Sequence, residues 1–122
     1  MAGLTTTEAQ ATLDARFPTT GATDYIAYST NGSSEFGGLA RTAIGATGWA
    51  AATAADPSVK ANANSLTTAT ATSAGTVTHF AVYSASSGGT QRTDWTALSA
   101  PKTLAIGDSA TWAVGACKVT LT

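Results

Sequence analysis

The sequence predicts a mainly β protein, namely an antiparallel β-sandwich or partly open barrel with one short N-terminal helix. Two observations support this fold class. A helix-capping pattern stands at the front of the chain, and several short alternating segments follow, separated by turn signals about every 8–12 residues. The 122 residues fit one ordinary domain. We therefore expect an N-terminal helical arm over residues 1–20 and a β-sandwich domain over residues 21–122.

The helix is predicted by two overlapping capping boxes. Thr5 is followed three residues later by Glu8, and Thr7 is followed at the same spacing by a glutamine. In such a box the hydroxyl accepts a hydrogen bond from a free backbone N–H of the first turn. The helix is expected to run to about Phe17, because Pro18 cannot continue it.

One face of this helix carries a narrow apolar stripe. Ala9, Leu13 and Phe17 recur at four-residue spacing, and Leu4 precedes them. A helix of about three turns is marginal alone, so the stripe must be buried against something. We predict that these four residues contact a partner protein; the alternative is that the helix plugs an open end of its own domain.

The first strands are predicted before residue 64. Residues 24–30 alternate, with apolar side chains on one face, and the Asn31–Gly32 pair that follows is a strong turn signal. A second strand is expected over residues 39–44. Residues 50–63 are an alanine-rich connector that contains a proline and lacks large apolar side chains, so no stable helix is expected there.

A steadier β pattern begins at residue 66. Residues 66–71 alternate threonine with small residues, and residues 76–83 are a β-branched and aromatic run typical of a central strand. The Ser-Ser-Gly-Gly sequence at residues 86–89 predicts a hairpin loop. The return strand is then expected near residues 91–98.

Two further β segments are predicted at the C-terminal end. Residues 104–106 and 110–114 flank the Gly107–Asp108 turn, and this arrangement predicts a hairpin. Residues 117–121 then carry apolar side chains at every second position, which predicts a last strand.

The charge pattern argues against nucleic-acid and membrane partners. The sequence has six Lys and Arg residues and seven Asp and Glu residues, and these charges are scattered singly along the chain. Binding to nucleic-acid phosphates needs clustered cations. No apolar stretch approaches the roughly 18 residues of a membrane span, and the first residues resemble no signal peptide, so we expect synthesis in a cytoplasm. Only 11% of residues are charged, and such a neutral, hydroxyl-rich surface suits packing against copies of itself.

The inventory of chemically reactive side chains predicts no catalysis. His79 lies within a predicted strand, where a structural imidazole is favoured over a metal ligand or a base. Asp24, Asp94 and Asp108 lie at strand ends or turns, where Asp commonly bonds to its own backbone. Cys117 is the only cysteine in the sequence, so an intrachain disulfide is excluded. We expect it to be a small buried side chain. We expect a non-enzymatic protein without cofactor or metal.

The three tryptophans allow two interpretations. Trp49, Trp95 and Trp112 are aromatic residues of a small β domain, where such side chains dominate cores and interfaces. They are also the residue type that stacks on sugar rings in carbohydrate-binding proteins. The core or interface role is favoured.

A set of segments along the chain carries a family resemblance. They are residues 24–30 (DYIAYST), 37–41 (GGLAR), 75–83 (GTVTHFAVY), 84–89 (SASSGG), 95–98 (WTAL), 101–103 (PKT), 106–108 (IGD) and 119–121 (VTL). Together they resemble a family of small structural proteins of tailed bacteriophages that are usually labelled tail fibre proteins. Relatives serve as minor capsid or decoration proteins of phages that infect actinobacteria. Leu39 stands where that family has an aromatic residue.

The resemblance implies a virion structural protein and two possible positions in the particle. The favoured one is a capsid decoration, or cement, subunit on the outer capsid surface, made in the cytoplasm of the bacterial host. Its partners would be the major capsid protein and copies of itself, expected as trimers, and the helix stripe would contact a neighbouring virion protein. The alternative is a tail fibre or baseplate subunit that contacts a host cell-surface glycan. The small size and the lack of a coiled stalk favour decoration.

Overall fold

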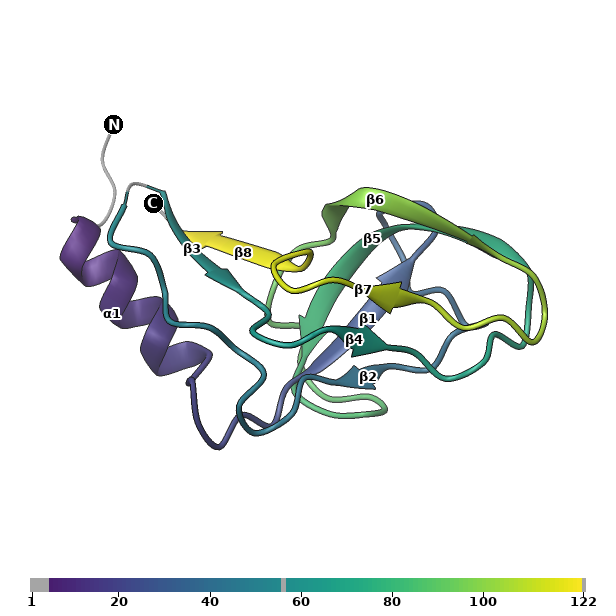
Figure 1. The fold of residues 1–122 in the computed structure, drawn as a ribbon, viewed down its shortest axis with the longest axis horizontal. Coiled ribbons are helices and arrows are strands. Elements are labelled where there is room, and N and C mark those ends of the chain that lie inside the picture. The colour runs from purple at the N-terminus through teal and green to yellow at the C-terminus, as the bar shows by residue number, and fades with distance from the viewer. Residues whose placement is uncertain (1–4, 56, 122) are drawn as a thin grey trace.

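The protein is mainly β, with antiparallel strand pairs and one short helix, as the sequence predicts. The computed structural model describes residues 5–55 and 57–121, and Figure 1 shows its elements. They are α1 (Thr6–Arg16), β1 (Tyr25–Ser29), β2 (Thr42–Ala43), β3 (Ser58–Ala61), β4 (Leu66–Thr67), β5 (Gly75–Tyr83), β6 (Thr96–Leu104), β7 (Thr111–Trp112) and β8 (Lys118–Leu121). These described strands form no closed barrel. The single described helix is too short to span a membrane.

Helix α1 begins and ends where the sequence predicts. The Thr5 hydroxyl caps it by accepting a hydrogen bond from the Glu8 N–H at 3.3 Å. At the other end the Phe17 N–H donates to the Leu13 carbonyl at 2.8 Å, and Pro18 follows. The helix lies against β3 and β8 (Figure 1). The division into an arm and a separate domain stays a prediction.

The largest sheet has four strands in the order β2-β1-β5-β6. Strand β5 is central and pairs with β1 from Tyr25↔Tyr83 to Ser29↔His79. Alternation along β1 places Ile26 and Tyr28 on one face, and both are fully buried. The predicted strands at residues 24–30 and 76–83 are thereby confirmed within one residue at each end.

The two-stranded β4–β7 pair covers the core face of this sheet (Figure 1). The rings of Tyr28 on β1 and Trp112 on β7 stack between the two layers, with centroids 4.9 Å apart and planes 14° from parallel. Leu66 on β4 lies directly opposite Trp112 and is also buried. The core therefore sits between the sheet and this ribbon, as in a sandwich.

One strand prediction at the C-terminal end is wrong, and the return strand predicted before it pairs with β5 but begins later than expected. Residues 104–106 and 110–114 do not pair with each other: β6 ends at Leu104 and pairs with β5, whereas β7 pairs with β4. The Gly107 turn between them exists, with φ of +90°, but there the chain crosses from one layer to the other. The return strand expected at residues 91–98 begins only at Thr96, after an isolated bridge between Gln91 and Tyr83.

The connector over residues 50–63 contains a strand that the sequence does not predict. Strand β3 pairs with β8, which lies near the other end of the chain. Its side chains alternate between buried and half-buried, and the buried ones include Ser58 and Lys60. Polar residues in these positions conceal the strand from an analysis of apolar periodicity.

Candidate functional site

An open pocket of about 490 Å³ lies at one end of the four-stranded sheet. We call it the Tyr25 pocket. Three segments form its walls: residues 22–25 at the start of β1, residues 43 and 45 at the end of β2, and residues 84–86 in the loop after β5. They comprise Ala22, Thr23, Asp24, Tyr25, Ala43, Gly45, Ser84, Ala85 and Ser86.

Strand register explains why these three segments meet. Tyr25 lies directly opposite Ala43 on β2 and opposite Tyr83 on β5. Antiparallel pairing therefore brings the start of β1, the end of β2 and the end of β5 together at the same end of the sheet. The loop that begins at Ser84 continues from β5 and forms the third wall of the pocket.

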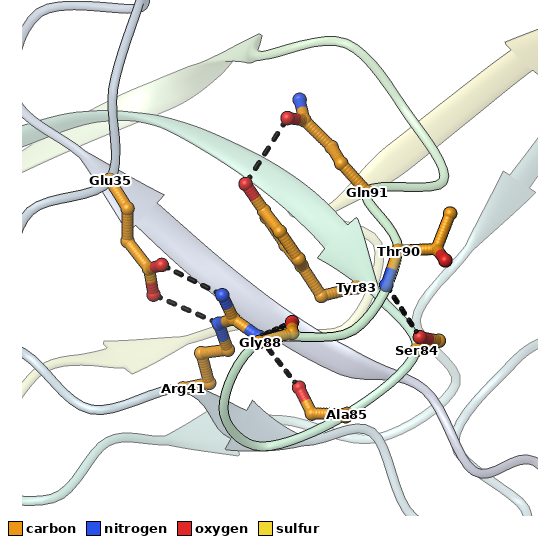
Figure 2. A network of polar contacts seen from close by, with 8 residues as sticks. All are labelled: Glu35, Arg41, Tyr83, Ser84, Ala85, Gly88, Thr90 and Gln91. Atoms are coloured by element: carbon orange, nitrogen blue, oxygen red, sulfur yellow. Dashed lines mark hydrogen bonds and ion pairs between the residues drawn. The ribbon is translucent and has the colours of Figure 1, made fainter.

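Arg41 makes four polar contacts, and two of them hold this loop in place (Figure 2). Its Nε and Nη2 donate to the two carboxylate oxygens of Glu35 at 2.9 and 2.8 Å. Its Nη1 donates to the carbonyls of Ala85 and Gly88, both at 2.8 Å. The guanidinium also lies 3.8 Å from the centre of the Tyr83 ring. The side chain is only 7% exposed, so this anchor is largely shielded from solvent.

The electrostatics of this anchor are local. The Glu35 carboxylate raises the pKa of the Arg41 guanidinium above its usual range, mainly through the hydrogen bond between them. The fork-shaped guanidinium bonds a carboxylate and two carbonyls at once, which a lysine ammonium does not match geometrically. Arg41 therefore acts as a positioning residue for the loop.

The loop is also closed on itself. The Ser84 N–H donates to the Thr90 carbonyl at 3.0 Å, and the Thr90 N–H donates to the Ser84 hydroxyl oxygen at 2.8 Å (Figure 2). Gly89 has a φ of +72°, and an added Cβ there would lie 2.7 Å from the Ser84 hydroxyl oxygen. These contacts make the loop a defined wall of the Tyr25 pocket.

The pocket offers hydroxyl groups and an aromatic ring but little charge. Thr23, Ser84 and Ser86 contribute hydroxyl side chains, and Tyr25 contributes a half-buried ring. The Asp24 carboxylate already has two partners: Arg92 pairs with it at 2.9 Å, and the Trp49 indole N–H donates to it at 3.3 Å. Such a surface suits a neutral molecule with many hydroxyl groups.

A family comparison identifies the kind of protein that carries this pocket. Residues 3–120 match the model of a family described as podophage GP4 fiber I protein gp80. The chain belongs to this family. It is therefore a phage structural protein of the fibre type, and the resemblance deduced from the sequence is confirmed. The description supports the tail-fibre alternative more than capsid decoration. No curated protein matches the chain.

Of the ionisable residues singled out in the sequence of this fibre-family protein, His79 and Asp108 have contacts with neighbouring residues. Asp24 was expected to bond to its own backbone, but its carboxylate contacts Arg92 and the Trp49 indole instead. The His79 Nδ1 lies 2.7 Å from the Thr78 hydroxyl oxygen, and the Asp108 carboxylate accepts from the Ala105 N–H at 2.9 Å. Asp94 is exposed, on the loop before β6. Within residues 5–55 and 57–121, no three His, Cys, Asp or Glu side chains are grouped so as to hold a metal ion.

The tryptophans and the cysteine divide between core and surface. Trp49 and Trp112 are at most 2% exposed and belong to the core. Trp95 is half-buried, and its ring centroid lies 6.2 Å from that of Tyr83. Cys117 is fully buried, and burial raises the pKa of its thiol to about 12, so it is not a reactive thiolate near neutral pH.

The helix stripe is covered by the chain itself. Ala9, Leu13 and Phe17 are 2–3% exposed, and the Phe17 ring packs on that of Trp49 with centroids 5.2 Å apart. Leu4 lies outside the described residues. This is the arrangement expected when the helix covers its own domain. Partner contact through the stripe stays a prediction, and any such contact is limited to the little of the stripe that remains accessible.

The sequence analysis missed the residues that build the Tyr25 pocket. Tyr25 and Arg41 appeared only as members of motifs that carry the family resemblance. One signal was available for Arg41, since an arginine close to two turn glycines is notable in a chain with only 11% charged residues. No local pattern indicated that it would contact a loop more than forty residues away.

Proposed function

We propose that this protein is a non-enzymatic fibre subunit of a phage tail and that its Tyr25 pocket binds a neutral glycan of the host cell surface. The observation that carries the proposal is an open pocket whose lining residues include one aromatic residue and three residues with hydroxyl side chains. The family description supports the fibre part of the proposal.

The pocket chemistry fits a sugar in three respects. The apolar face of a pyranose ring packs on an aromatic ring such as Tyr25, while its hydroxyls exchange hydrogen bonds with Ser and Thr side chains. The volume of about 490 Å³ lies within the range of about 300–1,000 Å³ that is usual for small-molecule sites. The wall that Arg41 holds is preorganised, which reduces the entropy lost on binding.

Binding to a surface polysaccharide extracted from the host bacterium tests the glycan site. We expect Tyr25→Ala to weaken binding at least tenfold. Ser86→Trp should do the same by filling the pocket without removing any contact seen in the structure. The matched control is Thr103→Ala, an exposed threonine on β6 at the opposite end of the sheet. If both pocket variants fold and bind as well as the control, the glycan proposal is wrong.

Labelling of intact virions tests the position in the particle. An antibody against this protein should decorate the tail and not the head. Label over the whole head would instead support the capsid decoration alternative, with the major capsid protein as the partner. This experiment does not depend on the glycan, so the two parts of the proposal can fail separately.

Self-association is a further part of the proposal. The sparse charge and the many small side chains permit copies of the chain to approach closely, and trimers are the expected assembly. Sedimentation of the purified protein and a map of the virion would both report the stoichiometry. Single copies without mutual contact in the virion would contradict it.

A further inference from the structure

A second depression of about 580 Å³ lies on a different part of the molecule, between helix α1, strand β8 and the segment before β6. We call it the α1–β8 groove. All four residues of β8 line it, together with Thr12, Leu13 and Arg16 of the helix, its C-cap residue Phe17, and residues 92–94 and 96. It shares no lining residue with the Tyr25 pocket.

One side of the groove is an open strand edge. Strand β8 pairs with β3 along one edge only, and among the described residues no backbone hydrogen bond satisfies its other edge. Every second residue of an antiparallel strand directs its N–H and C=O away from its partner. An edge of this kind is a template for one more strand, and proteins normally protect it unless it is used.

The floor of the groove is apolar. Val119 lies directly opposite Lys60, whose ammonium contacts Asp14 on α1, so this face of the ribbon is the one turned to the helix. Val119 and Leu121 share that face and are half-buried. Alternate side chains of an added strand would therefore reach an apolar strip beside Leu13 and Phe17.

The rim of the groove is positively charged. Arg16 and Lys118 are exposed, and neither makes an ion pair within the described part of the chain. Asp94 is the one carboxylate among the described residues that line the groove, and the third cation there, Arg92, is already paired with Asp24 at 2.9 Å. In full antiparallel register between two copies of β8, Lys118 of each copy would lie opposite Leu121 of the other, so a second β8 offers no carboxylate to the two unpaired cations, which favours an acidic partner over a second copy.

We propose that the α1–β8 groove receives an extended, acidic segment of another virion protein, which adds a strand to the open edge of β8. Main-chain hydrogen bonds to β8 provide the pairing, apolar side chains of the segment pack on Val119 and Leu121, and its carboxylates lie near Arg16 and Lys118. Strand β8 is four residues long, so the contact spans about 13 Å. Helix α1 stays in place and forms one wall.

Site-specific photocrosslinking in assembled virions tests the occupant. A photoreactive amino acid at Thr12 or at Thr120, both exposed and both on the groove, should link to one segment of another virion protein. Sequencing of the linked peptide should show several Asp or Glu residues. Thr103 is the control position, on the far edge strand. Linkage to a second copy of this chain, to a segment without acidic residues, or to nothing would overturn the proposal.

Charge reversal provides a second test. The double variant Arg16→Glu, Lys118→Glu should fold normally and enter virions at least tenfold less well in a complementation assay. The matched control Lys102→Glu changes a cation on β6, outside the groove, and should be incorporated normally. Binding of host polysaccharide by the purified variant should be unchanged, which separates this site from the Tyr25 pocket. Normal incorporation of the double variant would contradict the proposal.

Discussion

Lys60 on β3 and Asp14 on α1 form an ion pair, with the ammonium nitrogen 2.6 Å from the carboxylate oxygen. The Lys60 side chain is fully buried, whereas Asp14 is 38% exposed. The same carboxylate oxygen accepts the Ala52 N–H at 2.9 Å, and Gln10 donates to the Ala52 carbonyl at 3.1 Å. These contacts fasten the helix to the ribbon and compensate a cation that would otherwise be costly to bury.

Removing Asp14 should destabilise the protein. Asp14→Ala leaves the buried Lys60 ammonium without a counter-charge. We expect a loss of about 2–3 kcal/mol in the free energy of unfolding, less than a fully buried pair loses because Asp14 is partly exposed. Urea unfolding measures the effect. Asp94→Ala, which removes an exposed carboxylate, should change stability by less than about 0.5 kcal/mol. Equal stabilities for the two variants would show that the ion pair contributes nothing.

The same pair predicts a dependence of stability on pH. The Lys60 ammonium and the Ala52 N–H lower the pKa of Asp14 below its usual 3.8 in the folded protein. The stability from this shift is therefore present above about pH 4 and is lost as pH falls toward the folded-state pKa. Unfolding measured at pH 7 and at progressively lower pH should show the difference between wild type and Asp14→Asn shrinking. A constant difference down to pH 2 would rule out this linkage.

Phe17 should contribute strongly to the stability of the whole domain. Its ring is 3% exposed and packs against Trp49, so Phe17→Ala leaves a cavity beneath the helix. We expect a loss of about 3–5 kcal/mol, a large share of the stability of a small domain. Thr12→Ala, at an exposed helical position, is the control and should be nearly neutral. A cooperative thermal transition that is the same in both variants would mean that α1 is not part of the folded core.

A pair of glycine substitutions separates backbone strain from steric clash. Gly32 and Gly21 have φ of +76° and +71°, but an added Cβ lies 2.9 Å from the His79 ring at Gly32 and meets open space at Gly21. Gly21→Ala should cost about 1–2 kcal/mol from the left-handed conformation alone. Gly32→Ala should cost more, and His79→Ala in the same chain should remove the excess. Chemical denaturation of the four proteins gives the comparison, and equal costs at both glycines would disprove the clash.

Arg41→Lys should loosen the loop wall of the Tyr25 pocket without unfolding the protein. A lysine retains one charge but loses the paired bonds to Glu35 and the simultaneous bonds to Ala85 and Gly88. Amide hydrogen exchange in residues 84–90 should accelerate while exchange in β1 and β5 stays unchanged. Lys102→Arg is the control for a conservative cation exchange elsewhere. Unchanged exchange in the loop would show that Arg41 does not position it.

Elements that depend on neighbouring residues could be predicted from the sequence. The Thr5 cap and Pro18 set the ends of the helix, because capping and proline act within one turn. The β-branched and aromatic run of β5 predicted the central strand, and Gly107 predicted a turn that the structure contains. Membership of a phage fibre family was likewise recognisable from short motifs in order along the chain.

The pairing of the strands and the side chains that meet at a site depend on contacts between distant parts of the chain, which local sequence patterns do not reveal. Strand β3 pairs with β8 near the other end of the chain. Strand β7 pairs with the distant β4, and not with β6 across the Gly107 turn where a hairpin was predicted. Burial of Lys60 and the contact of Arg41 with the loop at Ala85 depend on those pairings. Strands of two residues, such as β4 and β7, carry too little periodicity to specify a partner strand. Packing of Tyr28 against Trp112 and of the helix against β3 therefore selects how the strands are arranged.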